Sequence, residues 1–213
     1  MKKTVFWDLD RVLLRTDALL QWILEDLGRA VGWQPEQIAV AIVEVDKTGF
    51  EWCKLLEHVG LPREQCDVKE KLYFDHYETR TCDFVAPGVL AVVTQLAERG
   101  MKQSLVTFGQ EKFQREKWNR LTPFHPYITT QSYVRPGETK GERIAELLTE
   151  DDASEAFFVD DSTEMLRSAL LHSPRVRRIR ATWIVEHIPH PGDDVYWFVA
   201  CTPEQALAQI LAV

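Results

Sequence analysis

The amino-acid sequence predicts an α/β protein with a doubly wound parallel β-sheet and an all-helical insertion after the first strand. Three observations lead to this prediction. A short apolar run opens the chain, the stretch that follows shows only helical spacing, and strands and helices then alternate to the end. Because strands separated by helices of about ten residues form βαβ units, the sheet is expected to be parallel and covered on both faces.

The opening segment, KTVFWDL over residues 3–9, is predicted to be a central strand. Its apolar, aromatic and β-branched residues suit a strand that is buried on both faces. Asp8 and Asp10 come at the end of this segment, and a second apolar stretch follows them. In extended chain, side chains two positions apart lie on the same face, so the two carboxylates are expected to point the same way.

Residues 15–83 are predicted to form the helical insertion, or cap, which leaves residues 1–14 and 84–213 for the core domain. The first helix of the cap is indicated by leucine and isoleucine residues at helical spacing from Leu19 onward. Further helical stretches are predicted over 35–47, 50–58 and 62–80.

The rest of the chain alternates between the two kinds of element. Strands are predicted over residues 102–108, 126–130, 155–161, 176–184 and 194–200. Helices are predicted over residues 89–100, 109–121, 140–148, 163–171 and from 202 onward. Local signals support the helix ends: Gly100 is a typical C-terminal cap, and Thr139 and Glu142 have the spacing of a capping box.

Composition excludes several classes of function. The chain has 213 residues and a formal net charge of −8, with RVRRIR at 175–180 as its densest basic segment, so neither nucleic acid nor an anionic membrane is an expected partner. No run of about 18 apolar residues is present, so no membrane span is predicted. Four cysteines at wide, irregular spacings favour reduced thiols in a cytoplasmic protein.

Polar residues gather at the predicted strand ends. In an open α/β sheet the ligand crevice lies at the carboxyl ends of the strands. The residues predicted to meet there are Asp8, Asp10, Thr107, Lys140, Asp160 and Asp161. Two carboxylates about 4 Å apart repel by about 4 kcal/mol at an effective dielectric constant of about 20, so a cation is expected among them. Ligands that are all oxygens favour Mg²⁺.

The order of these residues resembles the four-motif pattern of the haloacid dehalogenase superfamily of phosphatases. The motifs are Asp-Leu-Asp-Arg-Val from Asp8, then Thr107, then Lys140, then Asp160 and Asp161. Each motif alone is common, whereas all four in this order are specific. The helical insertion resembles the first-position cap of that family. The resemblance implies a Rossmann-like core and a Mg²⁺-dependent phosphatase that acts on a small phosphorylated metabolite.

The resemblance also implies a role for each residue. Asp8 would be the nucleophile that forms an aspartyl-phosphate, and Asp10 the general acid and base. Thr107 would hydrogen-bond a phosphoryl oxygen, and Lys140 would offset the charge of the nucleophile and the phosphate. Asp161, assisted by Asp160, would hold Mg²⁺ together with Asp8 and the backbone carbonyl of Asp10.

The chain departs from the family pattern at three places. Arg11 stands where Gly is usual, Phe108 and Gly109 replace the frequent Asn-Gly, and Met165 stands where some members carry an acid. A phosphomutase and a non-catalytic protein that binds a phosphorylated ligand remain alternatives. A dehalogenase is disfavoured because it would need neither Asp10 nor the acidic pair. A phosphorylation-switched receiver is disfavoured because its motifs come in the reverse order. The substrate and the oligomeric state stay open.

Overall fold

A parallel β-sheet lies between two layers of helices in the structure, a computed structural model that describes residues 2–46, 52–79, 81–135, 137–149, 153–184 and 196–212. The order of the strands is β3-β2-β1-β4-β5-β6, and every neighbouring pair is parallel. The strands are β1 (Lys3–Trp7), β2 (Lys102–Phe108), β3 (Thr130–Val134), β4 (Glu155–Asp160), β5 (Arg177–Ala181) and β6 (Phe198–Ala200). This arrangement confirms the predicted fold class.

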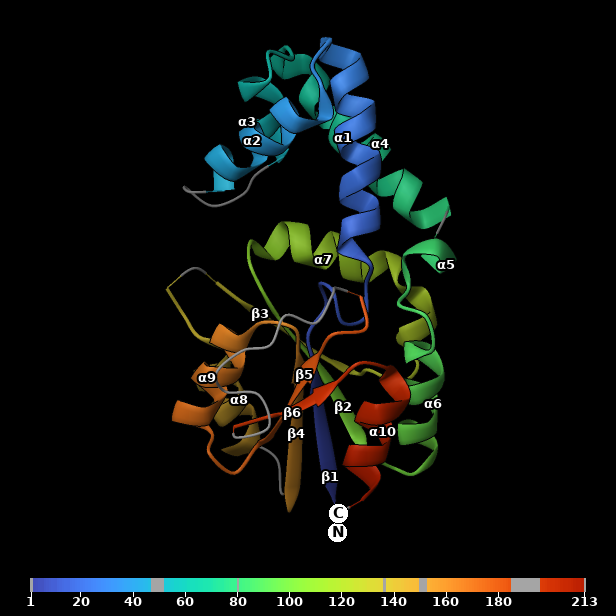
Figure 1. The fold of residues 1–213 in the computed structure, drawn as a ribbon, viewed down its shortest axis with the longest axis vertical. Coiled ribbons are helices and arrows are strands. Elements are labelled where there is room, and N and C mark those ends of the chain that lie inside the picture. Colours follow the sequence, from blue (N-terminus) through green and yellow to red (C-terminus); the bar gives the residue numbers. More distant parts are fainter. Residues whose placement is uncertain are drawn as a thin grey trace.

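The helices of the core cover both faces of the sheet. Helices α6 (Val89–Glu98) and α10 (Pro203–Leu211) lie on one side, and α8 (Lys140–Thr149) and α9 (Thr163–His172) on the other (Figure 1). Helix α7 (Glu111–Arg120) and the short 3₁₀ helix Thr122–Phe124 follow β2. Side chains alternate along the strands, so Val5 and Trp7 pack into one apolar cluster and Phe6 into another on the opposite face.

Strand β1 occupies the middle of the sheet and sets the level of its carboxyl edge. Trp7 lies opposite Leu105 of β2 and Val159 of β4, so β4 ends one residue beyond β1, and β2 continues to Phe108. The backbone N–H of Asp8 still donates to the carbonyl of Val159, at 3.0 Å. Residues that follow these strands are therefore brought to one place.

Four strand predictions differ from the structure. The strand predicted over 176–184 spans only Arg177–Ala181, and of the described residues within 194–200 only Phe198–Ala200 form a strand. The segment 126–130 was expected to be a strand, but β3 begins only at Thr130, because Pro126 lies in a turn after the 3₁₀ helix and has no N–H for a ladder. The first strand was expected to reach residue 9 but ends at Trp7. The chain turns there, and the N–H groups of Leu13 and Leu14 donate to the carbonyl of Leu9. Of the predicted strand 194–200, residues 194 and 195 lie outside the described part.

Between β1 and α6 the described elements are all helices. They are α1 (Thr16–Val31), α2 (Pro35–Asp46), α3 (Trp52–His58), α4 (Arg63–Thr79) and the short α5 (Thr81–Phe84), which the sequence did not predict. Helices α1 to α4 lie together beyond the carboxyl edge of the sheet (Figure 1). The predicted positions 47, 50, 51 and 80 lie outside the described residues.

The chain leaves and re-enters the core at neighbouring points. Leu14 forms an isolated antiparallel bridge with Val85, and the N–H of Arg15 donates to the carbonyl of Phe84 at 2.6 Å. The domain boundaries at residues 14 and 84 remain a prediction, and this double crossing supports them. None of the described helices is both long and apolar enough to cross a membrane.

Candidate active site

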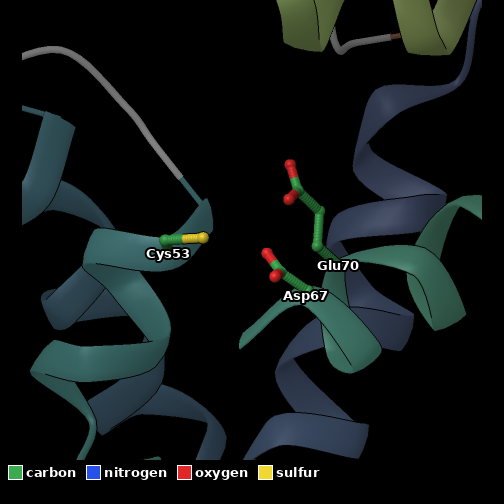
Figure 2. A group of neighbouring side chains, drawn as sticks. All are labelled: Cys53, Asp67 and Glu70. Carbon is green, nitrogen blue, oxygen red and sulfur yellow. The ribbon is translucent and has the colours of Figure 1, made fainter. Parts of the chain in front are cut away.

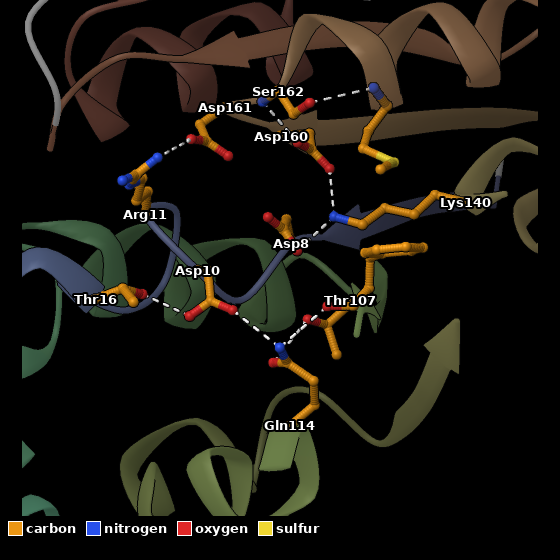
Figure 3. A network of polar contacts seen from close by, with 12 residues as sticks. Asp8, Asp10, Arg11, Thr16, Thr107, Gln114, Lys140, Asp160, Asp161 and Ser162 are labelled. Carbon is orange, nitrogen blue, oxygen red and sulfur yellow. Dashed lines mark hydrogen bonds and ion pairs between the residues drawn. The ribbon is translucent and has the colours of Figure 1, made fainter. Parts of the chain in front are cut away.

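Asp8, Lys140 and Asp160 form a buried group at the carboxyl edge of the sheet (Figure 3). The ammonium of Lys140 lies 2.6 Å from Oδ1 of Asp8 and 2.7 Å from Oδ2 of Asp160. Burial opposes the charge of Lys140, but the two carboxylates outweigh it and raise the pKa of the lysine. Burial raises the pKa of Asp8 to about 7, although Lys140 acts against this shift. The ammonium of Lys140 thus forms ion pairs with both carboxylates.

The start of helix α8 places Lys140 in this group. The hydroxyl of Thr139 accepts from the N–H of Glu142 at 3.2 Å, and the Glu142 carboxylate accepts from the N–H of Thr139 at 3.1 Å. This is the capping box that the sequence predicted. Next to Lys140, Gly141 lets α8 approach α9 closely, because a Cβ there would lie 2.3 Å from the carbonyl oxygen of Ser168. The lysine is therefore held by a fixed helix end.

Asp161 completes a group of three acids. Asp8, Asp160 and Asp161 each offer a carboxylate oxygen, and these oxygens lie within 4.8 Å of one another. Burial raises the pKa of Asp161 to about 6, and the nearby Asp8 adds to this shift, whereas Lys140 and Arg11 oppose it. Three crowded carboxylates with a single lysine leave negative charge to be balanced. Their oxygens are the donors that suit Mg²⁺, so the residues fit the expected metal.

The expectation that the carboxylates of Asp8 and Asp10 point the same way is wrong. The strand ends at Trp7, and the carboxylate of Asp10 points away from this group (Figure 3). Oδ1 accepts from the hydroxyl of Thr16 at 2.5 Å, and Oδ2 accepts from Nε2 of Gln114 at 3.2 Å and from the ammonium of Lys117. Burial acts to raise the pKa of Asp10, but Lys117 and these hydrogen bonds outweigh it and hold the pKa below its usual value. The metal contact predicted for Asp10 involves its backbone carbonyl, not its side chain. This contact remains a prediction.

Thr107 lies at the end of β2, beside Gln114. Its hydroxyl donates to Oε1 of Gln114 at 3.1 Å, and Nε2 of the same glutamine donates to the carbonyl of Phe108 at 3.0 Å. Gly109 has φ +131°, and a Cβ there would lie 3.0 Å from Nε2 of Gln114. Phe108 and Gly109 thus form a turn that Gln114 stabilises.

Arg11 adopts a backbone conformation that few side chains adopt. Its φ is 60°, in the left-handed region where glycine is favoured. Nε and Nη2 of Arg11 donate to Oδ1 of Asp17, both at 3.1 Å, and Nη1 lies 4.0 Å from Oδ2 of Asp161. The substitution adds a positive charge at the rim of the acidic group.

Sequence reasoning missed Thr16, Gln114 and Lys117. Gln114, Lys117 and Trp118 are buried at positions i, i+3 and i+4 of helix α7. A glutamine and a lysine on the buried face of the helix that follows Thr107 are the signal that could have identified them.

A second group of potential metal ligands lies in the helical insertion. Cys53, Asp67 and Glu70 offer ligand atoms within 4.8 Å of one another (Figure 2). Glu70 already forms an ion pair with Lys112 of α7, at 3.2 Å, and Asp67 is exposed. We therefore interpret this group as part of the polar contact between α4 and α7.

Comparisons with known proteins bear on the fold of the chain. No protein-family model matches the sequence, and no curated protein is significantly similar to it. Among solved structures, a Thermotoga maritima protein assigned as a β-phosphoglucomutase has 17% sequence identity and a TM-score of 0.70, with both chains covered completely. YfnB from Bacillus subtilis, assigned as a HAD hydrolase and bound to magnesium, has 14% identity and a TM-score of 0.67, with 100% of this chain and 99% of that chain covered.

A third structure adds a bound ligand. CbbY from Rhodobacter sphaeroides, in complex with xylulose-1,5-bisphosphate, has 15% identity and a TM-score of 0.62, with 95% of each chain covered. All three matches extend over the core and the helical insertion together. The chain therefore has the fold of the haloacid dehalogenase-like hydrolases.

Proposed function

We propose that the protein is a Mg²⁺-dependent phosphatase that hydrolyses a small phosphorylated metabolite through an aspartyl-phosphate. The observation that carries the proposal is the meeting of Asp8, Lys140, Asp160 and Asp161 at the carboxyl edge of the sheet, with Asp10 and Thr107 beside them. This set unites a nucleophile, a proton donor and balancing charges. Phosphoryl transfer requires these elements because its catalysis rests on positioning and on charge neutralisation.

In the first step, a carboxylate oxygen of Asp8 attacks phosphorus while the ester P–O bond breaks. The departing alkoxide takes a proton from Asp10, which must first acquire one because its pKa in the structure lies below its usual value. In the second step, water attacks the phosphorus of the aspartyl-phosphate and gives its proton to Asp10. Asp8 is regenerated, and inorganic phosphate leaves.

The remaining residues hold the reacting groups in place. Lys140 neutralises charge on Asp8 and on the incoming phosphate, and the hydroxyl of Thr107 would turn from Gln114 to a phosphoryl oxygen. Asp8, Asp160 and Asp161 would hold Mg²⁺, which when bound would supply positive charge that offsets the charge of the phosphoryl group. Small phosphorylated metabolites are the expected substrate class because helices α1 to α4 lie beyond the carboxyl edge of the sheet, where the acidic group is (Figure 1).

A phosphomutase is the second candidate, favoured by the likeness to the Thermotoga maritima protein. It would pass the phosphoryl group of Asp8 to a hydroxyl of a second substrate molecule instead of to water. The products distinguish the two candidates, since only hydrolysis releases inorganic phosphate in proportion to the substrate consumed.

The test is turnover of p-nitrophenyl phosphate and of a panel of sugar and organic phosphates, with Mg²⁺ and with EDTA. We expect Asp8→Asn to reduce turnover by more than about 10³-fold, because the nucleophile is lost. Asp17→Asn is the matched control, since Asp17 pairs with Arg11 outside the acidic group. Absence of turnover across the panel, or wild-type turnover by Asp8→Asn, would refute the proposal. A protein that only binds its ligand would give the first result.

A further inference from the structure

Lys117 is a buried lysine whose partner is the proposed proton donor. Only 1% of its side chain is exposed, and its ammonium forms an ion pair with Oδ2 of Asp10. The same ammonium lies 4.6 Å from the centre of the Phe113 ring. A lysine is rarely buried so completely without a specific partner, so this position calls for an explanation.

The hydrogen bonds of Asp10 are distributed unequally over its two oxygens. A carboxylate has about four acceptor sites, two on each oxygen. Lys117 and Gln114 occupy both sites of Oδ2, whereas among the described residues Thr16 is the one donor to Oδ1. One site therefore remains on Oδ1 for a proton that is exchanged with substrate or water.

We propose that Lys117 is a positioning residue that, with Gln114, saturates Oδ2 of Asp10 and so directs proton transfer through Oδ1. This inference rests on the proposed function. Without Lys117, Oδ2 would keep only the 3.2 Å hydrogen bond from Gln114, and the carboxylate could rotate. Either oxygen could then carry the proton, and fewer encounters would be productive, because proton transfer depends on close geometry.

Helix α7, which carries Lys117, also contacts the helical insertion. The ring of Phe113 packs edge-on against Trp52 of α3, with centroids 5.8 Å apart, and Lys112 pairs with Glu70 of α4 at 3.2 Å. Residues 112 and 113 thus contact the insertion, while residues 114 and 117 contact Asp10. The contacts of α7 to the insertion therefore contribute to the orientation of Asp10.

The test compares esters that do and do not need a proton on the leaving group. The ratio kcat/KM reports the steps up to the departure of the leaving group. p-Nitrophenolate leaves without protonation, whereas the alkoxide of a sugar or glycerol phosphate requires it. We expect Lys117→Met to reduce kcat/KM for the best alkyl ester of the panel by about 10- to 100-fold, and for p-nitrophenyl phosphate by less than about 3-fold.

A double-mutant cycle separates positioning from structural damage. In an Asp10→Asn background, Lys117→Met should cause no further loss beyond about 3-fold, because its effect passes through Asp10. Lys117→Gln, which keeps an N–H donor, should restore part of the alkyl-ester activity. Arg115→Met, on the same helix with a side chain that is 51% exposed and pairs with Glu111 of that helix, is the matched control and should affect both esters equally.

Equal losses on both esters, or a full additional loss in the Asp10→Asn background, would overturn the inference while leaving the proposed function intact. Absence of turnover by the wild type would instead refute the proposed function, and the inference with it. If thermal unfolding shows that Lys117→Met does not fold, Lys117→Gln carries the same comparison: a selective loss on the alkyl ester supports positioning, and an equal loss overturns it.

Discussion

Replacing Asp161 by asparagine is expected to stabilise the metal-free protein while removing its response to Mg²⁺. Asp161 lies close to Asp8 and Asp160. Among the described residues it forms an ion pair with Arg11, whose Nη1 lies 4.0 Å from Oδ2 of Asp161. Its ionised form is therefore unfavourable in the folded state unless a metal is bound. Asparagine has nearly the same shape and carries no charge, so it removes this cost together with a metal ligand.

The magnitude follows from the pKa of the carboxyl group. Burial and the neighbouring acid raise the pKa of Asp161 from 3.8 to about 6, which corresponds to about 3 kcal/mol. Between about pH 4 and 6 the folded state binds more protons than the unfolded state, so the free energy of unfolding falls as the pH rises through this window. Above pH 6 the full cost is present, and below pH 4 it is absent.

The assay is urea unfolding at pH 4 and pH 8, with EDTA and with Mg²⁺. At pH 8 in EDTA, Asp161→Asn should be more stable than the wild type by about 2–3 kcal/mol, and at pH 4 the two should be nearly equal. Mg²⁺ at 100 times its dissociation constant should stabilise the wild type by about 2.7 kcal/mol and the variant far less. Asp17→Asn, outside the acidic group, should follow the wild type in its response to Mg²⁺.

Two results would refute this reasoning. If Asp161→Asn were less stable than the wild type at pH 8 in EDTA, the ionised carboxylate would be stabilising in the folded protein, contrary to the geometry of the acidic group. If Mg²⁺ stabilised the variant as much as the wild type, the ion would bind without Asp161.

Three further substitutions test the surroundings of the site by urea unfolding in EDTA. Lys140→Met removes the cation between two buried carboxylates and should lower the free energy of unfolding by about 3–5 kcal/mol at pH 8; a loss below about 1 kcal/mol would contradict the buried ion pairs. Gly141→Ala should cost more than about 2 kcal/mol, because its Cβ would meet a backbone oxygen of Ser168 at 2.3 Å, and a neutral effect would show that α8 and α9 can separate. Trp7→Phe should cost about 1–3 kcal/mol, since Oε1 of Gln103 would lose the buried indole donor at 3.0 Å, and unchanged stability would argue against that bond.

The fold and the acidic group could be predicted because the sequence shows where the apolar strands end and which polar residues stand there. Asp8, Thr107 and Asp160 each close an apolar strand, and the carboxyl ends of neighbouring parallel strands meet at one edge. The position of β3 was harder to predict, because residues 126–130 and 130–134 both contain aromatic or β-branched residues. Only the pairing with β2, which joins Ser104 to Thr130, selects the second segment.

The contacts of Asp10 could not be predicted from local patterns. Lys117 stands 107 positions away from Asp10 in the chain, and a lysine in a charged helix is normally exposed to solvent. Its burial depends on the packing of α7 against both β3 and α4, which no periodicity describes. The positive φ of Arg11 was equally hidden, because arginine gives no local indication of a left-handed conformation.

Helix α7 also constrains how this protein could change its substrate during evolution. Alterations in the insertion that displace Lys112 or Phe113 would move Gln114 and Lys117 with them, because all four residues lie on two consecutive turns of the same helix. New specificity could therefore arise more readily in α2 than in α1, whose first residue, Thr16, contacts Asp10. Remodelling of α3 or α4 would disturb the chemistry unless α7 kept its register.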